Sequence, residues 1–378
     1  MDPEVFRNEY WERRPLRIPR NDPRHFAELL TLSDVDALLS RSGPDFSNIR
    51  VVSEGQETPV SALGGTDRLE MLYERYRSGS TIVLNALERR WDPLTRLTTR
   101  LSAEVGARFQ VNAYLTPGGR ARGFDPHYDN HDVIILQAHG TKSWRLYGMP
   151  DALPLRSQRY GAARPVPEAE EEFDLEPGSV LYLPRGTVHA ATSTDTASLH
   201  LTLGVHPVLF PALLGEAVQD LAEEDEALRR GLPIGFASDE GRRREAERMI
   251  EGLLEAVRTR LTPRELTDRA VRRAVSIAPP VLRGHLTDLE RMPGLDGDTP
   301  VRLRPDLRWR VSLTHEHVEL AFHNKTVRLP RHVADEVRFV LESGHDPFTA
   351  ASITGDLDRP GRLLLVHTLV REGLLTVG

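Results

Sequence analysis

The amino-acid sequence predicts an α+β protein in which an antiparallel β-sandwich or barrel is followed by helices and then by a small mixed module. Three observations indicate this class. Short apolar runs separated by glycine and proline fill residues 110–205, residues 211–280 show helical periodicity, and strand-like runs return after residue 300. A chain of 378 residues is long enough for two or three such domains.

Composition excludes several classes of protein. Hydrophobic residues make up 39% and charged residues 28%, which is ordinary for a globular protein and excludes general disorder. Cysteine is absent, so disulfides, thiolate catalysis, iron–sulfur clusters and cysteine zinc sites are excluded. No run of 18 apolar residues occurs, and the start MDPEVFRNEYWERRPLR is charged and contains proline. We therefore expect neither a signal peptide nor a membrane span, and a cytoplasmic protein.

The first predicted domain covers residues 1–210. Apolar residues at helical spacing indicate helix in residues 22–40, with Ser33 as the N-cap of a second helical piece. Strands are predicted at residues 110–116, 132–138, 143–148, 179–184 and 198–205. Turn sequences such as PGGRARGFDP, HGTK and PRGT separate them, which is typical of antiparallel sheets.

The second predicted domain, residues 211–285, is helical. One helix over residues 212–231 is expected to end at Gly231, and a second covers residues 241–261. A third begins at Thr262, with Pro263 and Glu265 completing its N-terminal signal. An apolar stripe at helical spacing needs a partner surface; it consists of Leu253, Leu254, Val257 and Leu261. A homodimer is the expected use of this stripe, although the protein's own β-domain is an alternative partner.

The third predicted domain, residues 300–378, combines strands at 309–313, 317–323 and 325–330 with helices at 330–343 and 362–373 and a last strand at 374–378. This arrangement resembles a winged-helix module. The region holds eleven basic and ten acidic residues, and the whole chain carries a net charge of −7. Since a DNA-binding surface needs excess positive charge, we expect no direct DNA binding.

Three residues in the first domain suggest a metal site. His127 and Asp129 stand two apart in a strand-like context, so their side chains point to one face, and His189 follows the run EPGSVLYLPRGT. Two imidazoles and one carboxylate form the facial triad that holds Fe(II) while leaving positions open for a 2-oxo acid and dioxygen. A lone H-x-D triplet is a weak signal; its place beside a predicted strand and the second histidine strengthen it.

Lys142 adds to this prediction. It follows the strand at residues 132–138, at a hairpin that leads back toward the same pocket. A lysine inside a barrel needs an anionic partner, and the distal carboxylate of 2-oxoglutarate would supply one. An exposed hairpin lysine is the alternative.

The sequence resembles the cupin-4 branch of the JmjC oxygenases, the family that includes the ribosomal oxygenases. The resemblance rests on FRNEYWERRPLRI, NAYLTPGG followed by PHYDNHDVIILQAHGTKSWRLY, EPGSVLYLPRGTVHAATS, and SLHLTLGV. It implies a double-stranded β-helix (cupin/JmjC jelly-roll) core, a helical dimerisation region and a C-terminal winged-helix-like domain.

The resemblance also implies roles for single residues. It makes His127, Asp129 and His189 the iron ligands and Lys142 the partner of 2-oxoglutarate. Two further pairs, Asn112 with Tyr114 and His200 with Thr202, fall on positions that line the cosubstrate or substrate pocket. For His200 and Thr202, a hydrogen-bonded barrel interior is an equal alternative. Departures from the family pattern occur at Asn130-His131-Asp132, near the substrate entrance. His131 is expected at the surface, with a substrate contact left open.

By this resemblance we expect an Fe(II)- and 2-oxoglutarate-dependent oxygenase that uses O2 to hydroxylate a protein or peptide side chain. Arginine or histidine of a ribosomal protein is the leading candidate. A peptide or small natural product is the alternative substrate. A different class of function, a zinc- or manganese-binding cupin without oxygenase activity, also fits a three-ligand site. A purely structural metal is disfavoured, because structural zinc sites usually have four protein ligands.

Overall fold

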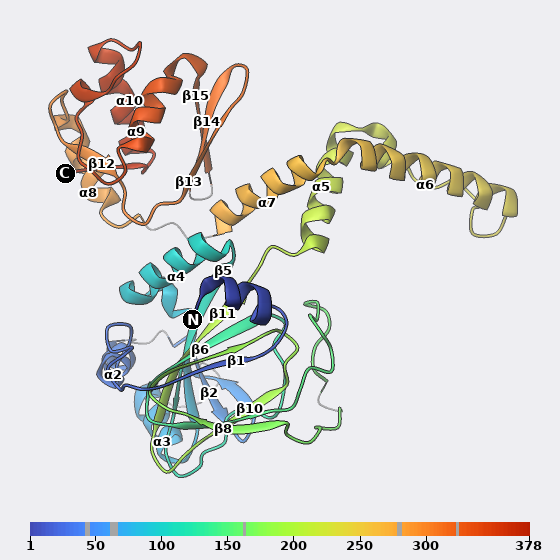
Figure 1. Cartoon of the computed structure of the whole chain (residues 1–378), viewed down its shortest axis with the longest axis vertical. Coiled ribbons are helices and arrows are strands. Elements are labelled where there is room, and N and C mark those ends of the chain that lie inside the picture. The colour runs from blue at the N-terminus through green and yellow to red at the C-terminus, as the bar shows by residue number, and fades with distance from the viewer. Residues whose placement is uncertain (42–45, 61–66, 162–163, 278–281, 323–324) are drawn as a thin grey trace. The chain divides into compact units, whose positions relative to one another are not determined.

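The computed structural model describes residues 1–41, 46–60, 67–161, 164–277, 282–322 and 325–378. Within them the chain forms two compact units, residues 1–102 with 108–206 and residues 103–107 with 207–378 (Figure 1). Each unit combines helices with antiparallel strands, which confirms the mixed α+β class. The three domain boundaries drawn from the sequence stay a prediction.

The first unit is built on two antiparallel sheets. The larger has the spatial order β1-β9-β6-β11-β5-β4-β2-β3, and the smaller the order β10-β7-β8. The larger sheet contains β1 (Leu16–Asn21), β2 (Ile49–Ser53), β3 (Gln56–Pro59), β4 (Thr81–Leu84), β5 (Arg108–Thr116), β6 (Asp132–His139), β9 (Gly178–Leu183) and β11 (Ser198–His206). The smaller contains β7 (Lys142–Leu146), β8 (Glu171–Leu175) and β10 (His189–Ser193). All five strands predicted between residues 110 and 205 are present.

The neighbouring strands β5 and β11 carry an apolar face and a polar face. Odd-numbered residues from Phe109 to Leu115 and from Leu199 to Val205 are apolar and at most 6% exposed. Even-numbered residues are polar or glycine, and they stand opposite one another, as in the pairs Tyr114–His200 and Asn112–Thr202. Because side chains alternate across a strand, one face packs in the core and the other lines a polar interior.

The turn between β6 and β7 requires glycine. Gly140 has φ of 61°, and a Cβ atom there would lie 1.8 Å from the carbonyl oxygen of Ala197. Only glycine combines this backbone conformation with such a close approach. The turn places Lys142 at the first position of β7.

The helices of the first unit agree with the sequence prediction only over residues 32–40. They are α1 (Pro3–Val5), followed by a π-helical turn (Phe6–Tyr10), α2 (Leu32–Arg41), α3 (Arg68–Arg77), a 3-10 turn (Leu87–Arg89) and α4 (Asp92–Val105). Residues 23–29 form turns, so the helix predicted over residues 22–40 is wrong in its first half. Thr31, and not Ser33, makes the capping bonds, since its Oγ1 accepts from the Asp34 amide while the Asp34 carboxylate accepts from the Thr31 amide.

The second unit begins with the predicted helices. These are α5 (Phe210–Glu224), a 3-10 turn (Glu226–Arg229), α6 (Glu240–Arg260) and α7 (Pro263–Ile277). The predicted start of α7 is confirmed by reciprocal hydrogen bonds between Thr262 and Glu265. The prediction that Gly231 ends the first helix is wrong. Asp225 adopts an extended backbone and caps the following turn through the amide of Ala227, so α5 ends at Glu224.

The rest of the second unit packs helices on short sheets. Its elements are α8 (His285–Arg291), 3-10 turns (Met292–Gly294, Arg331–Val333 and Ala350–Ser352), β12 (Val301–Leu303), β13 (Trp309–Leu313), β14 (His317–Phe322), β15 (Lys325–Pro330), α9 (Ala334–Glu342), α10 (Arg359–Arg371) and β16 (Leu375–Val377). Strand β14 is central between β13 and β15, and β12 pairs with β16. Val318, Leu320 and Phe322 of β14 are fully buried in one apolar cluster with Val340 and Val366. Within the described residues, no helix is long and apolar enough to cross a membrane.

A buried ion pair ties α8 to the C-terminal strand. Arg304 and Asp288 are each 3% exposed, and Nη2 of Arg304 lies 2.6 Å from Oδ2 of Asp288. Arg304 also donates to the carbonyl of Gly373, and Asp288 accepts from Thr376 and from the amide of Val377. Both charges are therefore paired and hydrogen-bonded, which offsets the cost of burying them.

We expect Asp288→Ala to destabilise the second unit by about 3–5 kcal/mol, because it leaves the Arg304 guanidinium buried without its counter-ion. Urea denaturation of the full chain, followed by circular dichroism, measures the change. Asp298→Ala is the matched control, since Asp298 pairs with Arg359 at the surface, where both side chains are more than two-thirds exposed. Equal effects of the two substitutions would contradict a structural role for the buried pair.

Candidate metal centre

Main-chain hydrogen bonds bring the predicted metal ligands together. The amide of His127 donates to the carbonyl of His189 at 3.2 Å, and the amide of His189 donates to the carbonyl of His127 at 2.9 Å. Asp129 is held to the same segment, because its carbonyl accepts from the amide of Gly186 at 3.1 Å. Two segments about sixty residues apart in the chain thus run side by side with their side chains converging.

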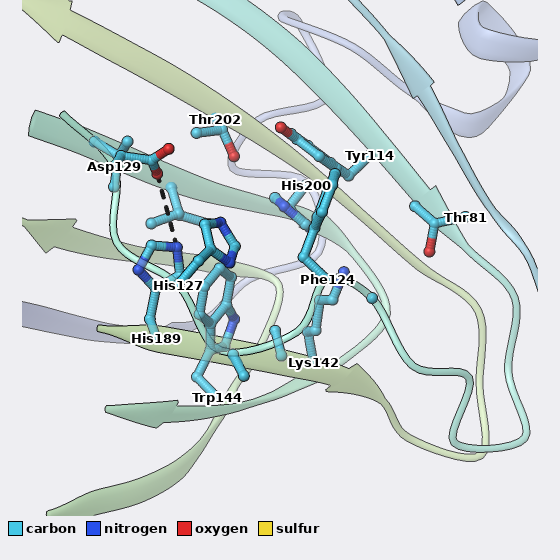
Figure 2. Close-up of a pocket in the computed structure, with 15 residues that line it drawn as sticks. Thr81, Tyr114, Phe124, His127, Asp129, Lys142, Trp144, His189, His200 and Thr202 are labelled. Carbon is cyan, nitrogen blue, oxygen red and sulfur yellow. Dashed lines mark ion pairs between the residues drawn. The ribbon is translucent and has the colours of Figure 1, made fainter. Parts of the chain in front are cut away.

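The three side chains offer ligand atoms that all lie within 4.8 Å of one another. Nδ1 of His127 donates to the carbonyl of Asp125, and Nδ1 of His189 donates to the carbonyl of Thr187, which leaves both Nε2 atoms free to bind a metal. Nε2 of His189 lies 3.8 Å from Oδ2 of Asp129 (Figure 2). Among the described residues no other group of this kind occurs. Because the protein offers three ligands, the metal would keep coordination positions open.

The electrostatics of the cluster favour the protonation states that bind metals. Burial raises the pKa of Asp129, but the imidazoles of His131, His127 and His189 outweigh this effect and hold that pKa below its usual value. Burial, aided by the neighbouring His127, lowers the pKa of His189 to about 4. At neutral pH the carboxylate is charged and His189 is neutral, as metal coordination requires.

Lys142 is buried and shares a pocket with the triad. The side chain is 3% exposed at the start of β7, and its Nζ donates to Oγ1 of Thr116 at 3.0 Å. No carboxylate forms an ion pair with it among the residues that the structure describes. Burial lowers the pKa of Lys142 to about 7. The exposed-hairpin alternative is therefore excluded, and a cation that lacks a counter-ion faces the pocket.

His200, Tyr114 and Thr202 line the same pocket, on the polar face of β5 and β11. The rings of Tyr114 and His200 stack with centroids 4.8 Å apart. Nδ1 of His200 is buried without a hydrogen-bond partner among the described residues. Burial lowers the pKa of His200 well below its usual value, and burial beside Asp129 raises the pKa of Tyr114 to about 12. Both groups are therefore neutral near pH 7, and Figure 2 shows them between Asp129 and Thr81.

Asn112 lies outside this first pocket and lines a second one beside it. Its Oδ1 accepts from the amide of Ala86 at 3.1 Å. The two pockets share Tyr114, Phe124, Asp129 and Thr202. The second pocket is strongly polar; its other lining residues are Arg50, Glu57, Gln110, His131, Gly204 and His206.

His131 is part of this second pocket and is half-buried there, whereas the sequence analysis placed it at the surface. Its ring covers Gly204, where a Cβ atom would lie 3.2 Å from Cε1, and it packs edge-on against His206 with centroids 4.6 Å apart. A side chain at position 204 would push His131 away, so the glycine allows the imidazole to lie flat on the sheet.

Several residues in or next to the pockets were not predicted from the sequence. Thr116 lies two positions after Tyr114 on the same face of β5, so the alternation along that strand contained a signal for it. Thr81 comes from β4, and its Oγ1 lies 3.0 Å from Oγ1 of Thr116; no motif marks it. Trp144 lines the pocket from β7, and its Nε1 is buried without a hydrogen-bond partner among the described residues. Arg50 and Glu57 carry no sequence signal of their own, whereas Gln110 shares the alternation of β5 with Thr116.

The comparisons with known proteins agree with this geometry. A JmjC domain model matches residues 87–211. Ribosomal oxygenase 2 of Mus musculus is 32% identical over 277 residues, which are 69% of this chain and 58% of that protein. Ribosomal oxygenase 2 of Bos taurus is 31% identical over 322 residues, 80% of this chain and 69% of that protein. The chain thus spans little more than half of the mouse relative.

Solved structures agree at the level of fold. The Escherichia coli ribosomal oxygenase YcfD superposes with a TM-score of 0.57 and 17% identity, covering 100% of this chain and 98% of that one. A second structure of YcfD, in complex with cobalt and 2-oxoglutarate, superposes with a TM-score of 0.54 at the same identity and covers 99% and 98% of the two chains. By fold, sequence similarity and the His-x-Asp…His triad, the chain belongs to the JmjC-domain family that includes the ribosomal oxygenases.

Proposed function

We propose that the protein is an Fe(II)- and 2-oxoglutarate-dependent oxygenase that hydroxylates a side chain of a protein or peptide. One observation carries this proposal: a metal site with three ligands shares its pocket with Lys142, a buried cation that has no counter-ion among the described residues. A dicarboxylate satisfies both features, since one end can chelate the metal while the other neutralises the ammonium.

The residues present fit this cosubstrate. His127, Asp129 and His189 would hold Fe(II), and Lys142 with Thr116 would bind the distal carboxylate of 2-oxoglutarate. His200 and Trp144 bring buried ring nitrogens that have no partner among the described residues, and a bound ligand or water would satisfy them. When bound, iron and 2-oxoglutarate supply the activation of O2 and the oxidation of a C–H bond. The protein contributes fixed ligands, a cation and a pocket with apolar walls at Val133, Ile135 and Phe124.

The second pocket is the proposed entrance for the substrate. It reaches Asp129 from the opposite end of the polar face, and its lining of charged, amide and imidazole groups suits a side chain with several hydrogen-bonding atoms. The relatives are named ribosomal oxygenases, which makes arginine or histidine of a ribosomal protein our leading substrate. A peptide or a small natural product is the alternative.

The second unit has two proposed roles. Its C-terminal part is proposed to be a winged-helix-like domain, since a three-stranded sheet and the helices α9 and α10 share one core. Its helices α5–α7 are proposed to form a homodimer. Apolar side chains are left exposed on them, among them Phe210 at 80%, Leu254 at 65% and Ile250 at 43%.

The first prediction from the site concerns cosubstrate turnover. Anaerobic addition of Fe(II) and 2-oxoglutarate is expected to produce a weak visible charge-transfer band, because a bidentate 2-oxo acid on iron is needed for it. Asp129→Ala should abolish both the band and 2-oxoglutarate turnover while the protein stays folded, since Asp129 supplies a ligand and no packing layer. A wild-type protein without the band would favour a zinc- or manganese-binding cupin. Turnover retained in the variant would remove Asp129 from the site.

The second prediction concerns Lys142. In Lys142→Ala the distal carboxylate of 2-oxoglutarate loses its counter-ion, which typically costs about 3–5 kcal/mol, or roughly two to four decades in affinity. Titration of the Mn(II)-loaded protein with 2-oxoglutarate measures the change. Lys325→Ala is the matched control, because the chain has two lysines and Lys325 pairs with Glu372 at the surface. Binding within threefold of wild type in Lys142→Ala would assign the anchor to another residue.

The same group predicts a pH dependence. Burial lowers the pKa of Lys142 to about 7 in the free site. The side chain is therefore protonated at lower pH and loses its charge as the pH rises through that value. The affinity for 2-oxoglutarate should therefore fall above pH 7, by up to tenfold per pH unit. Lys142→Arg is the control, because a guanidinium stays charged and should bind with no such slope. A flat profile in the wild type would contradict the pairing.

The fourth prediction concerns the dimer. Light scattering at micromolar concentration should give twice the mass of the 42.5 kDa chain. Leu254→Glu on α6 should shift the protein toward the monomer, because it places a charge in the proposed interface. Leu364→Glu is the matched control, as Leu364 is 68% exposed on α10. A monomer mass for the wild type would overturn the proposal.

A further inference from the structure

A buried carboxylate that is not a metal ligand lies next to the triad. Asp132 is the first residue of β6, three positions after Asp129, and it is fully buried. Its Oδ1 accepts from the backbone amide of Arg185 at 3.1 Å and from the hydroxyl of Tyr182 at 3.2 Å. Its Oδ2 accepts from Nη1 of Arg185 at 3.0 Å. One carboxylate therefore binds both the main chain and the side chain of Arg185.

Arg185 occupies the turn that leads to the last metal ligand. It lies two residues after β9 ends at Leu183 and four residues before His189, and it is 6% exposed. The same Nη1 also donates to Oε1 of Glu12 at 2.6 Å. The guanidinium thus lies between Asp132, which belongs to the ligand-bearing segment, and Glu12, which belongs to the N-terminal segment.

These contacts stand where the two ligand-bearing segments leave the sheet. Strands β6 and β9 pair, with Val133 opposite Leu183. Moving away from that pair, the segments are tied first by Asp132 to Arg185, then by Asp129 to Gly186, and then by His127 to His189. The contact between Asp132 and Arg185 involves charged side chains, whereas the other two contacts are hydrogen bonds of the main chain.

We infer that Asp132 and Arg185 are positioning residues that set the affinity of the triad for a divalent metal. Asp132 holds the turn at Arg185 in register, so that Asp129 and His189 meet at the spacing a metal requires. Glu12 accepts from the same Nη1 of Arg185 and anchors the N-terminal segment without setting that spacing. The inference rests on the proposed metal site, and it adds two residues that touch neither the metal nor the cosubstrate.

The physical reason is that a metal ion binds tightly only when its ligand atoms lie close to their ideal positions. Ligands must be held to within a fraction of an ångström, and the groups that support them usually change metal affinity by about 10- to 100-fold when they are removed. Without the Asp132 carboxylate, the amide and guanidinium of Arg185 lose their shared acceptor. The turn at Arg185 can then move relative to β6, and any such movement changes the distance between Asp129 and His189.

The test is the affinity of the apo protein for Mn(II), followed by the electron paramagnetic resonance signal of the free ion. Asp132→Asn keeps the size of the side chain but replaces one acceptor oxygen with a donor, so it loses a hydrogen bond to Arg185 in either orientation. We expect its Kd for Mn(II) to rise by roughly 10- to 100-fold. Arg185→Lys, which keeps the charge but replaces the Nη1 donor with an ammonium, should also raise Kd, by less than Asp132→Asn does.

Glu12→Gln is the matched control, because it removes the negative charge of the other partner of the same Nη1 and keeps an oxygen that can accept from it. It should lower the thermal unfolding midpoint and leave the Kd for Mn(II) within twofold of wild type. A merely structural role for the whole cluster would instead raise the Kd of the three variants in proportion to their losses in melting temperature.

Two outcomes overturn the inference. One is a folded Asp132→Asn protein whose Kd for Mn(II) lies within threefold of wild type; if that variant does not fold, the same criterion applies to Arg185→Lys. The other is an equal loss of affinity in Glu12→Gln. Failure of the proposed function is distinguishable, because a wild-type protein that binds no Mn(II) would remove the metal site itself.

Discussion

The site depends on the alternation of side chains along two neighbouring strands. In β5 and β11 the odd-numbered residues are apolar and pack in the core, so the even-numbered residues must share the opposite face. The antiparallel register sets Tyr114 opposite His200 and Asn112 opposite Thr202. A shift of one residue in either strand would move the polar set into the core and the leucines into the cavity, which is why the register is strongly determined.

Two buried cations of the chain, Arg304 and Lys142, differ in their partners. Arg304 has a carboxylate and main-chain carbonyls as partners, and it closes a network that stabilises the C-terminal strand. Lys142 is equally buried, yet a hydroxyl is the hydrogen-bond partner of its ammonium among the described residues. A buried charge without a counter-ion destabilises the free protein, so it is better explained by a ligand than by folding. This contrast supports the assignment of Lys142 to an anionic cosubstrate.

The metal centre, in contrast, is organised by hydrogen bonds of the main chain. His127 and His189 exchange amide and carbonyl bonds, and each uses its Nδ1 on a carbonyl two residues earlier, which orients Nε2 toward the third ligand. The Asp132–Arg185 contact lies behind this arrangement, between the sheet and the ligands. The residues that would bind the metal are thus different from the residues that we infer to set the distances between the ligands.

The sequence alone was sufficient for the α+β class, the five strands between residues 110 and 205 and the start of α7, because these depend on periodicity and on local capping bonds. It also named the triad and Lys142, since motif spacing and family resemblance both point to them. It failed for residues 23–29 and for Gly231, where the local bonds of Asp22 and Asp225 outweighed helical spacing. Only the tertiary structure decided that Lys142 is buried, that His131 lies over Gly204, and that Thr81, Arg50 and Glu57 line the pockets. These facts depend on which strands become neighbours, and contacts between distant segments leave no periodic signal in the chain.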